Sequence, residues 1–458
     1  MYQIDFHHPI HIHFIGIGGI SMSGLAEILL EDGFPVSGSD SSKSPLTEQL
    51  EKKGAVIFYG QRASNIHDNV GLVVYTAAIQ KNNPEYEEAL RRSLPTMTRA
   101  QLLGQIMKKY EIPIAVSGTH GKTTTTSMIS QILLEENLDP TLSIGGILHS
   151  IGGNIRVGHS PYFVTEACEY TNSFLSFFPK IGIVLNIEED HMDFFENISQ
   201  IRDSFHKFAS LLPQDGLLII NKEILQWEKI VAGLPCPVVT FGFDEDCDYF
   251  ATNISFDSMA KPSFDLSSHG SIVPFTLNVP GRHNISNALA SIALARELHI
   301  SYASIQKALL HFSGTNRRFE WKGKVGQVSI IDDYAHHPTE IHATLSAALH
   351  YPHKSLWCVF QPHTYTRTKA FLKDFASSLS LADKIILTDI YAAREKDTLG
   401  ISSKCLQKEL EKLGCEVYYF PSFEEIENFL LLNCSPDDML ITMGAGDVNR
   451  IGERLLGQ

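Results

Sequence analysis

A glycine-rich loop that ends in lysine and threonine is the feature that most constrains the fold. Residues 117–123 read SGTHGKT, follow the apolar run Ile114–Val116 and precede a helical stretch at 124–136. In a P-loop, glycine lets backbone N–H groups curl around a phosphate, and the N-terminus of the next helix adds positive potential. The segment therefore predicts an α/β sheet with a phosphate-binding loop after a buried strand.

The residues of this loop have separate expected roles. Lys122 is expected to reach the β- and γ-phosphates, and Thr123 to offer its hydroxyl to Mg²⁺. The usual pattern has glycine where this chain has Val116, so a glycine-rich helix start with a solvated lysine is the alternative. The expected nucleotide-binding residues here are Gly118, Thr119, His120, Gly121, Lys122, Thr123 and Thr124.

A second glycine-rich turn, GIGG at 16–19, lies near the N-terminus between a β-branched run and a helical stretch. A dinucleotide fingerprint would have a third glycine where Ser21 stands. Three interpretations stay open: an NAD site, a site for another diphosphate such as that of a UDP-sugar, and a tight packing turn. The expected substrate-binding residues are Gly16, Gly18, Gly19 and Asp40, the last at the end of the next expected strand.

The chain divides into three segments that each begin with a strand. Its 458 residues are too many for one ordinary core. Strand-like runs begin near residues 11, 114 and 328, and helical stretches alternate with further strands. This pattern predicts an α/β fold with domains at 1–111, 112–315 and 316–458. Pro113 is expected to mark a linker, and 238–279 to form small antiparallel strands.

Charge and cysteine content exclude several classes of protein. The formal net charge is −15, which disfavours nucleic acid and anionic lipid as partners. The seven cysteines are scattered, as expected for reduced thiols in the cytoplasm. Residues 1–9 do not read as a signal peptide, and no apolar run is long enough for membrane insertion. Nothing in the sequence indicates an oligomeric state.

Acidic and histidine residues follow two of the expected strands. Glu166 ends one apolar stretch, and His191 follows another in NIEEDHMD. The carboxyl ends of parallel strands meet at one crevice, where a hard cation bridging ATP phosphates needs oxygen ligands. Glu166 is the preferred carboxylate, and His191 is a candidate ligand for a second Mg²⁺. A helix cap or a solvated charge is the alternative for each.

Motifs along nearly the whole chain resemble one family, the Mur ligases of peptidoglycan-precursor synthesis. In order they are GIGG, SGTHGKTTT, EACEY, NIEEDHMD, GRHNISNALA, GTNRRFE, DDYAHHPTE, QPHTYTRT and GAGD. The resemblance implies a Rossmann-like UDP-binding domain, a P-loop ATPase domain and a Rossmann-like C-terminal domain. It also implies an ATP- and Mg²⁺-dependent ligase that joins L-alanine to UDP-N-acetylmuramate through an acyl phosphate.

The resemblance also assigns roles to residues by matched motif. Lys122, Glu166, His191 and Arg318 are implied as catalytic, with Thr123, Glu166 and His191 around the metal. Asn284, Asn287, Arg318, Asp333 and His336 are implied to lie beside the nucleotide, and Arg367 to bind the amino acid. Each has an alternative: a helix cap for the asparagines, an Asx turn for Asp333, a surface loop for His336, and solvated charges for the arginines.

Four rival functions stay open at this point. A sister ligase adding another amino acid or a peptide would use the same chemistry. A folate polyglutamylating enzyme would share the central domain but lack the GIGG-type domain. A nucleotide-dependent switch would bind ATP without ligase turnover. An NAD-dependent oxidoreductase would use the first glycine turn but leave the P-loop unexplained.

Overall fold

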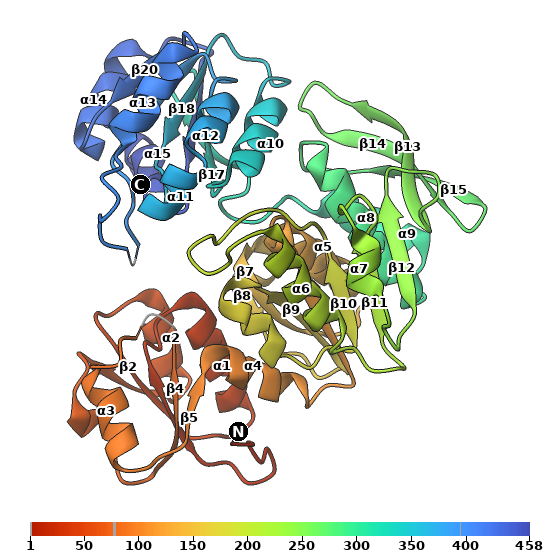
Figure 1. The fold of residues 1–458 in the computed structure, drawn as a ribbon, viewed down its shortest axis with the longest axis vertical. Coiled ribbons are helices and arrows are strands. Elements are labelled where there is room, and N and C mark those ends of the chain that lie inside the picture. Colours follow the sequence, from red (N-terminus) through yellow and green to blue (C-terminus); the bar gives the residue numbers. More distant parts are fainter. Residues whose placement is uncertain (1, 77–78, 394) are drawn as a thin grey trace.

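The computed structural model describes residues 2–76, 79–393 and 395–458. They form three sheets of five, ten and six strands, one in each of the segments expected from the sequence. Figure 1 shows the first part at the bottom, the C-terminal part at the top, and the central part between them. The predicted three-part α/β architecture is confirmed, whereas the domain limits stay a prediction.

The first sheet is parallel, in the order β3-β2-β1-β4-β5. The strand order reverses at β1, so ligands are expected beside its carboxyl end, where the GIGG turn lies. The strands are β1 (His11–Ile15), β2 (Val36–Asp40), β3 (Val56–Tyr59), β4 (Val70–Tyr75) and β5 (Thr96–Thr98). The helices are α1 (Ile20–Glu31), α2 (Pro45–Lys52), η1 (Ala63–Asn65), α3 (Pro84–Arg91) and α4 (Arg99–Met107).

The central sheet places the P-loop strand β6 between β10 and β9, fully inside the sheet. Its order is β15-β14-β13-β12-β11-β10-β6-β9-β7-β8. The strands are β6 (Ile112–Ser117), β7 (Thr141–Leu148), β8 (Gly153–Arg156), β9 (Tyr162–Ala167), β10 (Ile181–Val184), β11 (Leu217–Asn221), β12 (Val238–Gly242), β13 (Tyr249–Phe256), β14 (Pro262–Ser268) and β15 (Ser271–Thr276). The helices are α5 (Lys122–Glu135), η2 (His149–Ile151), η3 (Tyr170–Ser176), α6 (Ile198–Ala209), α7 (Trp227–Val231), α8 (His283–Glu297) and α9 (Tyr302–His311).

Two details of this part differ from the sequence-based expectation. Pro113 is not in the linker, because it is buried inside β6, where its carbonyl accepts from Lys180 N; the connection from α4 is 108–111. The stretch 238–279 is antiparallel only in β13–β15, since β12 pairs in parallel with β11. An exposed antiparallel face and a buried parallel strand carry similar apolar residues, so composition alone does not separate them.

The C-terminal sheet has the order β16-β17-β21-β18-β19-β20, parallel except for the β16–β17 hairpin. Its strands are β16 (Glu320–Val325), β17 (Val328–Asp333), β18 (Leu356–Phe360), β19 (Lys384–Leu387), β20 (Glu416–Tyr419) and β21 (Met439–Met443). Its helices are α10 (Pro338–Ala348), α11 (Tyr365–Ala370), α12 (Leu372–Leu379), α13 (Ser403–Lys412), α14 (Phe423–Asn433) and α15 (Asn449–Leu455). All of β18 and β21 is buried, as expected of central strands covered on both faces.

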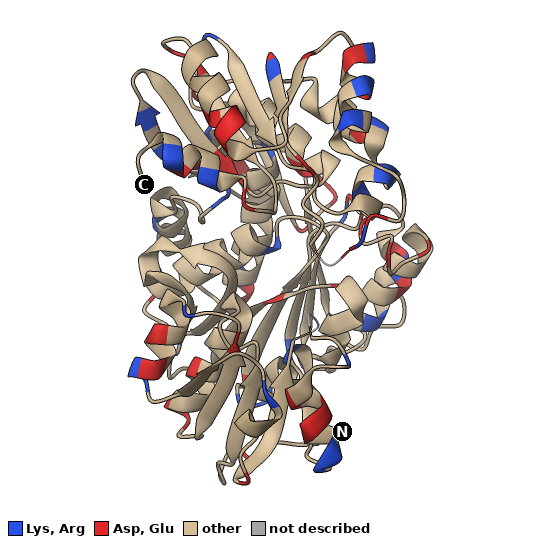
Figure 2. Ribbon diagram, turned by 90° about the vertical axis from the view of Figure 1, so that its left-hand side faces the viewer, with Lys and Arg blue, Asp and Glu red and all other residues tan. Residues whose placement is uncertain are grey.

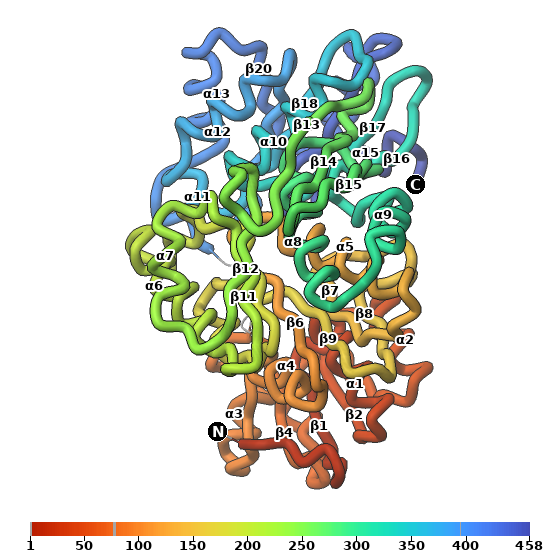
Figure 3. The backbone as a smooth tube through the Cα atoms, turned by 90° about the vertical axis from the view of Figure 1, so that its right-hand side faces the viewer, coloured from red at the N-terminus to blue at the C-terminus, as the bar shows by residue number. Residues whose placement is uncertain are grey.

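The central part reaches the C-terminal part through the β13–β14 hairpin. Ala260 at the hairpin turn belongs to the same apolar core as Ala347 and Tyr351. Figure 3 shows this hairpin rising beside α10. The chain itself crosses between the two parts next to Arg317, whose guanidinium donates to Asp332 and to the carbonyls of Gly444 and Gly446. The hairpin contact therefore joins these parts in addition to the covalent connection.

The surface carries both signs of charge on all three parts. Figure 2 shows Lys and Arg interspersed with Asp and Glu, without a continuous basic face in that view. Among the described residues no helix is both long and apolar enough to span a membrane. The net charge of −15 lies mostly in the central segment, because residues 112–315 contain 21 Asp and Glu but only 11 Lys and Arg.

Candidate active site

The loop between β6 and α5 has the backbone shape of a phosphate cradle. Gly118 and Gly121 have φ angles of +145° and +80°, a region that other residues rarely adopt. A Cβ at Gly121 would also lie 2.5 Å from the Asn287 side-chain oxygen. Both conformation and close packing therefore require glycine, as the sequence pattern predicted.

The Lys122 side chain folds back over this loop instead of extending into solvent. Its Nζ donates to the carbonyls of Gly118 and Thr119 at 2.5 and 3.0 Å, and to Glu169 Oε2 at 3.1 Å. Burial lowers the pKa of the Lys122 ammonium, but the Glu169 carboxylate outweighs it and raises the pKa above its usual value. A cation is thus fixed at the cradle, which argues against a solvated lysine.

The expected metal ligands Thr123 and Glu166 lie in direct contact. Thr123 Oγ1 donates to Glu166 Oε2 at 3.0 Å, and Gly145 N donates to the other carboxylate oxygen at 2.5 Å. A hydroxyl and a carboxylate at a P-loop form the oxygen donor set that Mg²⁺ prefers. These residues therefore fit a magnesium ion held against the phosphates.

His191 lies beside a different carboxylate from the one that the sequence suggested. Its Nε2 is 3.8 Å from Glu169 Oε1, and its ring stacks on Tyr170 with centroids 4.5 Å apart. That Glu169 oxygen is buried and accepts no hydrogen bond from the described residues. Burial lowers the pKa of His191, which keeps the imidazole neutral and able to ligate. The unpaired oxygen and the neutral ring together fit a second cation.

Glu169 is the residue that sequence reasoning left without a role. It links Lys122 to His191, and its side chain is only 2 % exposed. Its position three residues after Glu166, at the end of β9, was the available signal. An acid at that position follows the strand into the crevice, but only the fold shows that it turns toward the lysine.

A cavity of about 610 Å³ opens from this loop toward the C-terminal part. Arg318 enters it from the start of the C-terminal part and lies 3.7 Å from Glu340, at ion-pair distance. His336 N donates to the same Glu340, and burial lowers the pKa of His336 to about 3. The sequence-predicted members of this lining are Thr119, His120, Gly121, Lys122, Thr123, Glu166, His191, Arg318 and His336.

A smaller adjoining cavity, about 230 Å³, contains Gly121, Thr124, Asn284, Asn287, Arg318 and Asp333. Asn284 donates to Pro280 O at 2.7 Å and accepts from Asn287 at 3.0 Å, while Asn287 accepts from Thr125 at 3.2 Å. The asparagine pair therefore buttresses the phosphate loop from α8. Its role beside the nucleotide stays a prediction.

Asp333 is held by three donors at the end of β17. Its carboxylate accepts from the backbone N–H groups of Phe319 and Ala335 at 2.8 and 2.7 Å, and from the Thr344 hydroxyl at 3.1 Å. Burial raises its pKa to about 6. The contact with Ala335 has the spacing of the Asx turn that was the alternative interpretation, and the side chain still borders the smaller cavity.

His120 of the P-loop lies between two carboxylates from different parts of the molecule. Its ring nitrogens are 3.4 Å from Glu188 and 3.3 Å from Glu340. Burial lowers the pKa of His120, but the two carboxylates more than compensate and raise it to about 9. The loop is thereby tied to α10, and sequence reasoning did not find this link because it depends on how two domains meet.

Arg367 also joins two parts of the molecule. Two of its guanidinium nitrogens donate to Asp190 Oδ1 at 3.1 and 2.8 Å, and a third lies 3.1 Å from His363. Burial raises the pKa of Asp190, but Arg367 more than reverses this and holds it below its usual range. These residues border a cavity of about 300 Å³ that His191 also lines. Arg367 is therefore buried in a carboxylate contact, not solvated.

The first glycine turn is closed by its own carboxylate. Gly16 has φ +84°, and Gly18 N donates to Asp40 Oδ2 at 2.8 Å. A Cβ at Gly18 would lie 2.8 Å from that same oxygen, and Gly19 forms the N-cap of α1. The four predicted residues are thus brought together, and their ligand stays a prediction.

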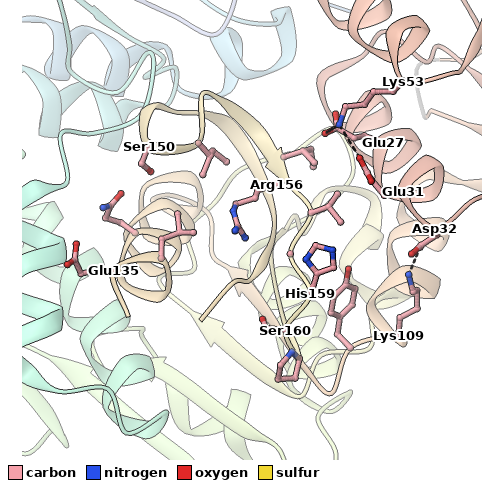
Figure 4. A pocket seen from close by; sticks show the side chains of 18 residues that line it. Glu27, Glu31, Asp32, Lys53, Lys109, Glu135, Ser150, Arg156, His159 and Ser160 are labelled. Carbon is pink, nitrogen blue, oxygen red and sulfur yellow. Dashed lines mark hydrogen bonds and ion pairs between the residues drawn. The ribbon is translucent and has the colours of Figure 1, made fainter. Parts of the chain in front are cut away.

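A larger cavity, about 830 Å³, lies between the first and central parts and away from this chemistry (Figure 4). Its lysines are already paired: Lys53 with Glu27 and Glu31, and Lys109 with Asp32. Arg156 reaches Asp139 and Pro140 O. Mutually neutralised charges leave no group poised for reaction, so the smaller cavities at the P-loop are the candidate site.

Three α/β sheets with a P-loop where the central and C-terminal parts meet indicate a protein that binds a nucleotide, and comparison with known proteins identifies the class. Residues 11–111 match "Mur ligase family, catalytic domain", 116–295 match "Mur ligase middle domain", and 317–446 match "Mur ligase, glutamate ligase domain". The chain belongs to the Mur ligase family.

Relatives of similar length show which members of this family the chain is similar to. It is 59% identical over 457 residues, covering 100% of both chains, to "UDP-N-acetylmuramate--L-alanine ligase" of Agathobacter rectalis. A crystal structure of UDP-N-acetylmuramate–alanine ligase from Thermotoga maritima is 31% identical with a TM-score of 0.82, covering 98% of each chain. A murein peptide ligase from Psychrobacter arcticus is 27% identical with a TM-score of 0.75, again over 98% of each chain.

Proposed function

We propose that this chain is an ATP-dependent ligase that joins L-alanine to the carboxylate of UDP-N-acetylmuramate in peptidoglycan-precursor synthesis. The observation that carries the proposal is full-length similarity to ligases of that name together with a P-loop whose lysine is fixed by Glu169. The sister murein peptide ligase is a more distant match, at 27% identity. We place the reaction in the cytoplasm, where ATP is available.

The reaction follows from the difficulty of attacking a carboxylate. An amine cannot expel oxide, so the muramyl carboxylate first attacks the γ-phosphorus of ATP, forming an acyl phosphate and releasing ADP. The amine of L-alanine then attacks the acyl carbon, the C–O bond to phosphate breaks, and the amine loses a proton. The products are the amide, ADP and phosphate.

The chain contributes mainly position and charge. Lys122, already cationic within the loop, offsets the charge that develops on the transferred phosphoryl group. Arg318 borders both cavities at the loop and supplies a second cation from the C-terminal side. The contacts of Glu340 and His120 hold that side against the loop, which excludes water from the acyl phosphate.

Magnesium is part of the proposal. Thr123 and Glu166 would hold one ion against the phosphates, and His191 with the unpaired Glu169 oxygen would hold a second. The ions supply neutralisation of the phosphate and carboxylate charges when bound. Within the chain, Gly145 N fixes the orientation of the Glu166 carboxylate.

The remaining subsites follow from the two other clusters. We assign the UDP moiety to the turn of Gly16, Gly18, Gly19 and Asp40, where the N-terminus of α1 favours a pyrophosphate. We assign the amino acid to the cavity lined by Arg367, Asp190 and His191, where the guanidinium suits a carboxylate.

One assay tests the proposal against its rivals. Phosphate release is measured with UDP-N-acetylmuramate, ATP and Mg²⁺, adding one amino acid or peptide at a time, and the product is weighed by mass spectrometry. We expect release that depends on L-alanine and a product heavier by one alanyl residue. Stimulation by another amino acid or a peptide alone would favour a sister ligase, and ATP binding without release would favour a switch.

A further inference from the structure

Two histidines and a glutamate converge at the phosphate loop, separate from the proposed magnesium ligands. His120, Glu188 and His337 each place one potential ligand atom within 4.8 Å of the other two. The rings of His120 and His337 are 4.6 Å apart at an angle of 40°. His120 and Glu188 belong to the central part, whereas His337 precedes α10 of the C-terminal part.

One nitrogen in this cluster is buried and lacks a hydrogen bond. His120 Nε2 bonds to none of the described residues and lies 3.4 Å from a Glu188 oxygen. The other ring nitrogen, Nδ1, lies 3.3 Å from the Glu340 carboxylate. A carboxylate on one imidazole nitrogen, with the other facing a cluster, is the arrangement that orients histidine ligands in metal sites.

The second histidine has its outer nitrogen anchored as well. His337 Nε2 lies 3.0 Å from the backbone carbonyl of Glu189, which fixes a proton on that nitrogen. The lone pair is then on Nδ1, which receives a long contact of 3.3 Å from Thr339 N. Two imidazoles oriented by outer partners and one carboxylate make a donor set of the His₂Glu type.

We propose that His120, Glu188 and His337 form a binding site for a borderline divalent cation such as Zn²⁺, distinct from the magnesium positions at Thr123 and Glu166. Imidazole nitrogen selects zinc-like ions over magnesium, which prefers oxygen ligands. Metal–ligand bonds of about 2.1 Å put tetrahedral ligand atoms about 3.4 Å apart; His120 and Glu188 already have this separation, and His337, within 4.8 Å of both, would move toward them.

The surroundings provide access and an open coordination position. Glu188 and His337 both line a surface groove of about 440 Å³, and Glu188 also borders the smaller nucleotide cavity together with His120. An ion can therefore reach the cluster from solvent, and water can complete its coordination. Because the ligands come from two parts of the molecule, a bound ion would join the C-terminal part to the phosphate loop and slow the opening that releases ADP.

The test is titration of the untagged, full-length protein with Co²⁺, followed by displacement with Zn²⁺. We expect visible absorption typical of a nitrogen- and oxygen-ligated tetrahedral site, without the near-ultraviolet bands that cysteine thiolates would add. His337→Asn and Glu188→Gln should each weaken binding by at least about tenfold. The asparagine retains a side-chain acceptor for the α10 N-terminus, and the glutamine retains a carbonyl acceptor for Thr339 Oγ1.

His342→Asn is the matched control, because His342 lines the same groove outside the cluster. It should bind Co²⁺ as the unchanged protein does. Equal affinity in the unchanged protein, His337→Asn and Glu188→Gln would overturn the site, as would thiolate bands in the spectrum. Circular dichroism verifies folding, and Glu188→Gln alone decides the matter if His337→Asn does not fold.

A second measurement concerns the consequence for turnover and rests on the proposed function. With Mg²⁺ in excess, Zn²⁺ should slow L-alanine-dependent phosphate release in the unchanged protein and less so in Glu188→Gln. If Zn²⁺ inhibited the unchanged protein and Glu188→Gln equally, the idea that the ion joins the C-terminal part to the phosphate loop would be refuted. The Co²⁺-binding result would not be affected. A protein without ligase activity would still show the Co²⁺ spectrum, so the two proposals fail separately.

Discussion

The molecule has two glycine-rich turns that look alike in sequence and differ in charge. Each follows a central strand and opens a helix. The turn after β1 receives a carboxylate, Asp40, on Gly18 N, whereas the loop after β6 receives an ammonium, Lys122, on its carbonyls. A carboxylate thus contacts a backbone N–H in the first turn, whereas an ammonium contacts backbone carbonyls in the second, so the two turns offer a phosphate-bearing ligand different charges.

The two turns also differ in how they are connected. His120 and Lys122 tie the P-loop to Glu340 and Glu169, so this loop is part of a charged network that crosses domains. The turn after β1 makes its side-chain contact within its own sheet. The P-loop is therefore linked by ion pairs to the C-terminal part, as expected of a loop whose function depends on domain closure. Among the described residues, the turn after β1 lacks such a side-chain link, as expected of a loop that only binds a substrate.

Removal of Lys122 should produce the largest difference between the two turns. Lys122→Ala is expected to lower kcat/KM for alanine-dependent phosphate release by about 1000-fold, because the transferring phosphoryl loses its fixed cation. It should leave UDP-N-acetylmuramate binding unchanged in calorimetry. Lys109→Ala, a lysine paired with Asp32 in the cavity of Figure 4, is the control and should retain activity.

The same substitution leaves the buried Glu169 without its cation, and this effect needs separating. Lys122→Ala with Glu169→Gln should regain thermal stability without regaining activity. Activity within threefold of the unchanged enzyme in Lys122→Ala would contradict the P-loop assignment.

The pH dependence of stability should follow His120. Its folded pKa of about 9 lies above the usual 6.5, so it contributes stability that is complete below pH 6.5 and is lost as pH rises through 9. The difference between the folded and the usual pKa of His120 corresponds to a stabilisation of at most about 3 kcal/mol. The free energy of unfolding, measured with denaturant between pH 6 and pH 10 (a window of about four units), should fall less at alkaline pH for His120→Gln than for the unchanged protein. Parallel plots of this free energy against pH for the two proteins would contradict the prediction.

Equivalent glycine substitutions should separate the two ligands. Gly121→Ala is expected to raise KM for ATP, and Gly16→Ala to raise KM for UDP-N-acetylmuramate, each by about tenfold, because a left-handed φ costs an L-residue about 1–2 kcal/mol. Steady-state kinetics with each substrate varied checks this. A rise in KM for ATP in Gly16→Ala, or binding of NAD by the unchanged protein, would reverse the assignment of the first turn.

The smallest effect is expected from Asp40. Asp40→Asn retains an acceptor for Gly18 N but loses the negative charge, so KM for UDP-N-acetylmuramate should change by a few-fold, about 1 kcal/mol. KM for ATP should not change. Asp32→Asn, at the C-terminal end of α1 in the same part of the chain but paired with Lys109, provides the comparison. Equal effects of the two variants would show that Asp40 has no special relation to the turn.

Local patterns were sufficient for much of the fold. The strands at 11–15, 328–333, 356–360 and 439–443 and the P-loop were predictable because apolar runs and glycine positions depend only on neighbouring residues. The Mur ligase assignment is confirmed by full-length relatives. The parallel pairing of β12 was not predictable, because the choice between parallel and antiparallel partners depends on the path of the intervening chain.

The candidate site was predictable in its parts but not in its pairings. Thr123 and Glu166 meet as expected, whereas His191 lies beside Glu169, which stands in the EACEY motif but had no assigned role. The ion pair of Arg367 with Asp190 joins residues far apart in sequence. Such contacts depend on the relative position of domains, which leaves no periodicity in the sequence.

The hairpin contact described above limits how the C-terminal part can move. A body attached by a single strand of chain can swing in any direction. Here the burial of Ala260 among Ala347 and Tyr351 adds a packed contact to the covalent connection, so the C-terminal part is not free to swing about that connection alone. Moving it away from the phosphate loop would in addition break the ion pairs Arg367–Asp190 and His120–Glu340, so opening and the loss of these charge contacts must occur together.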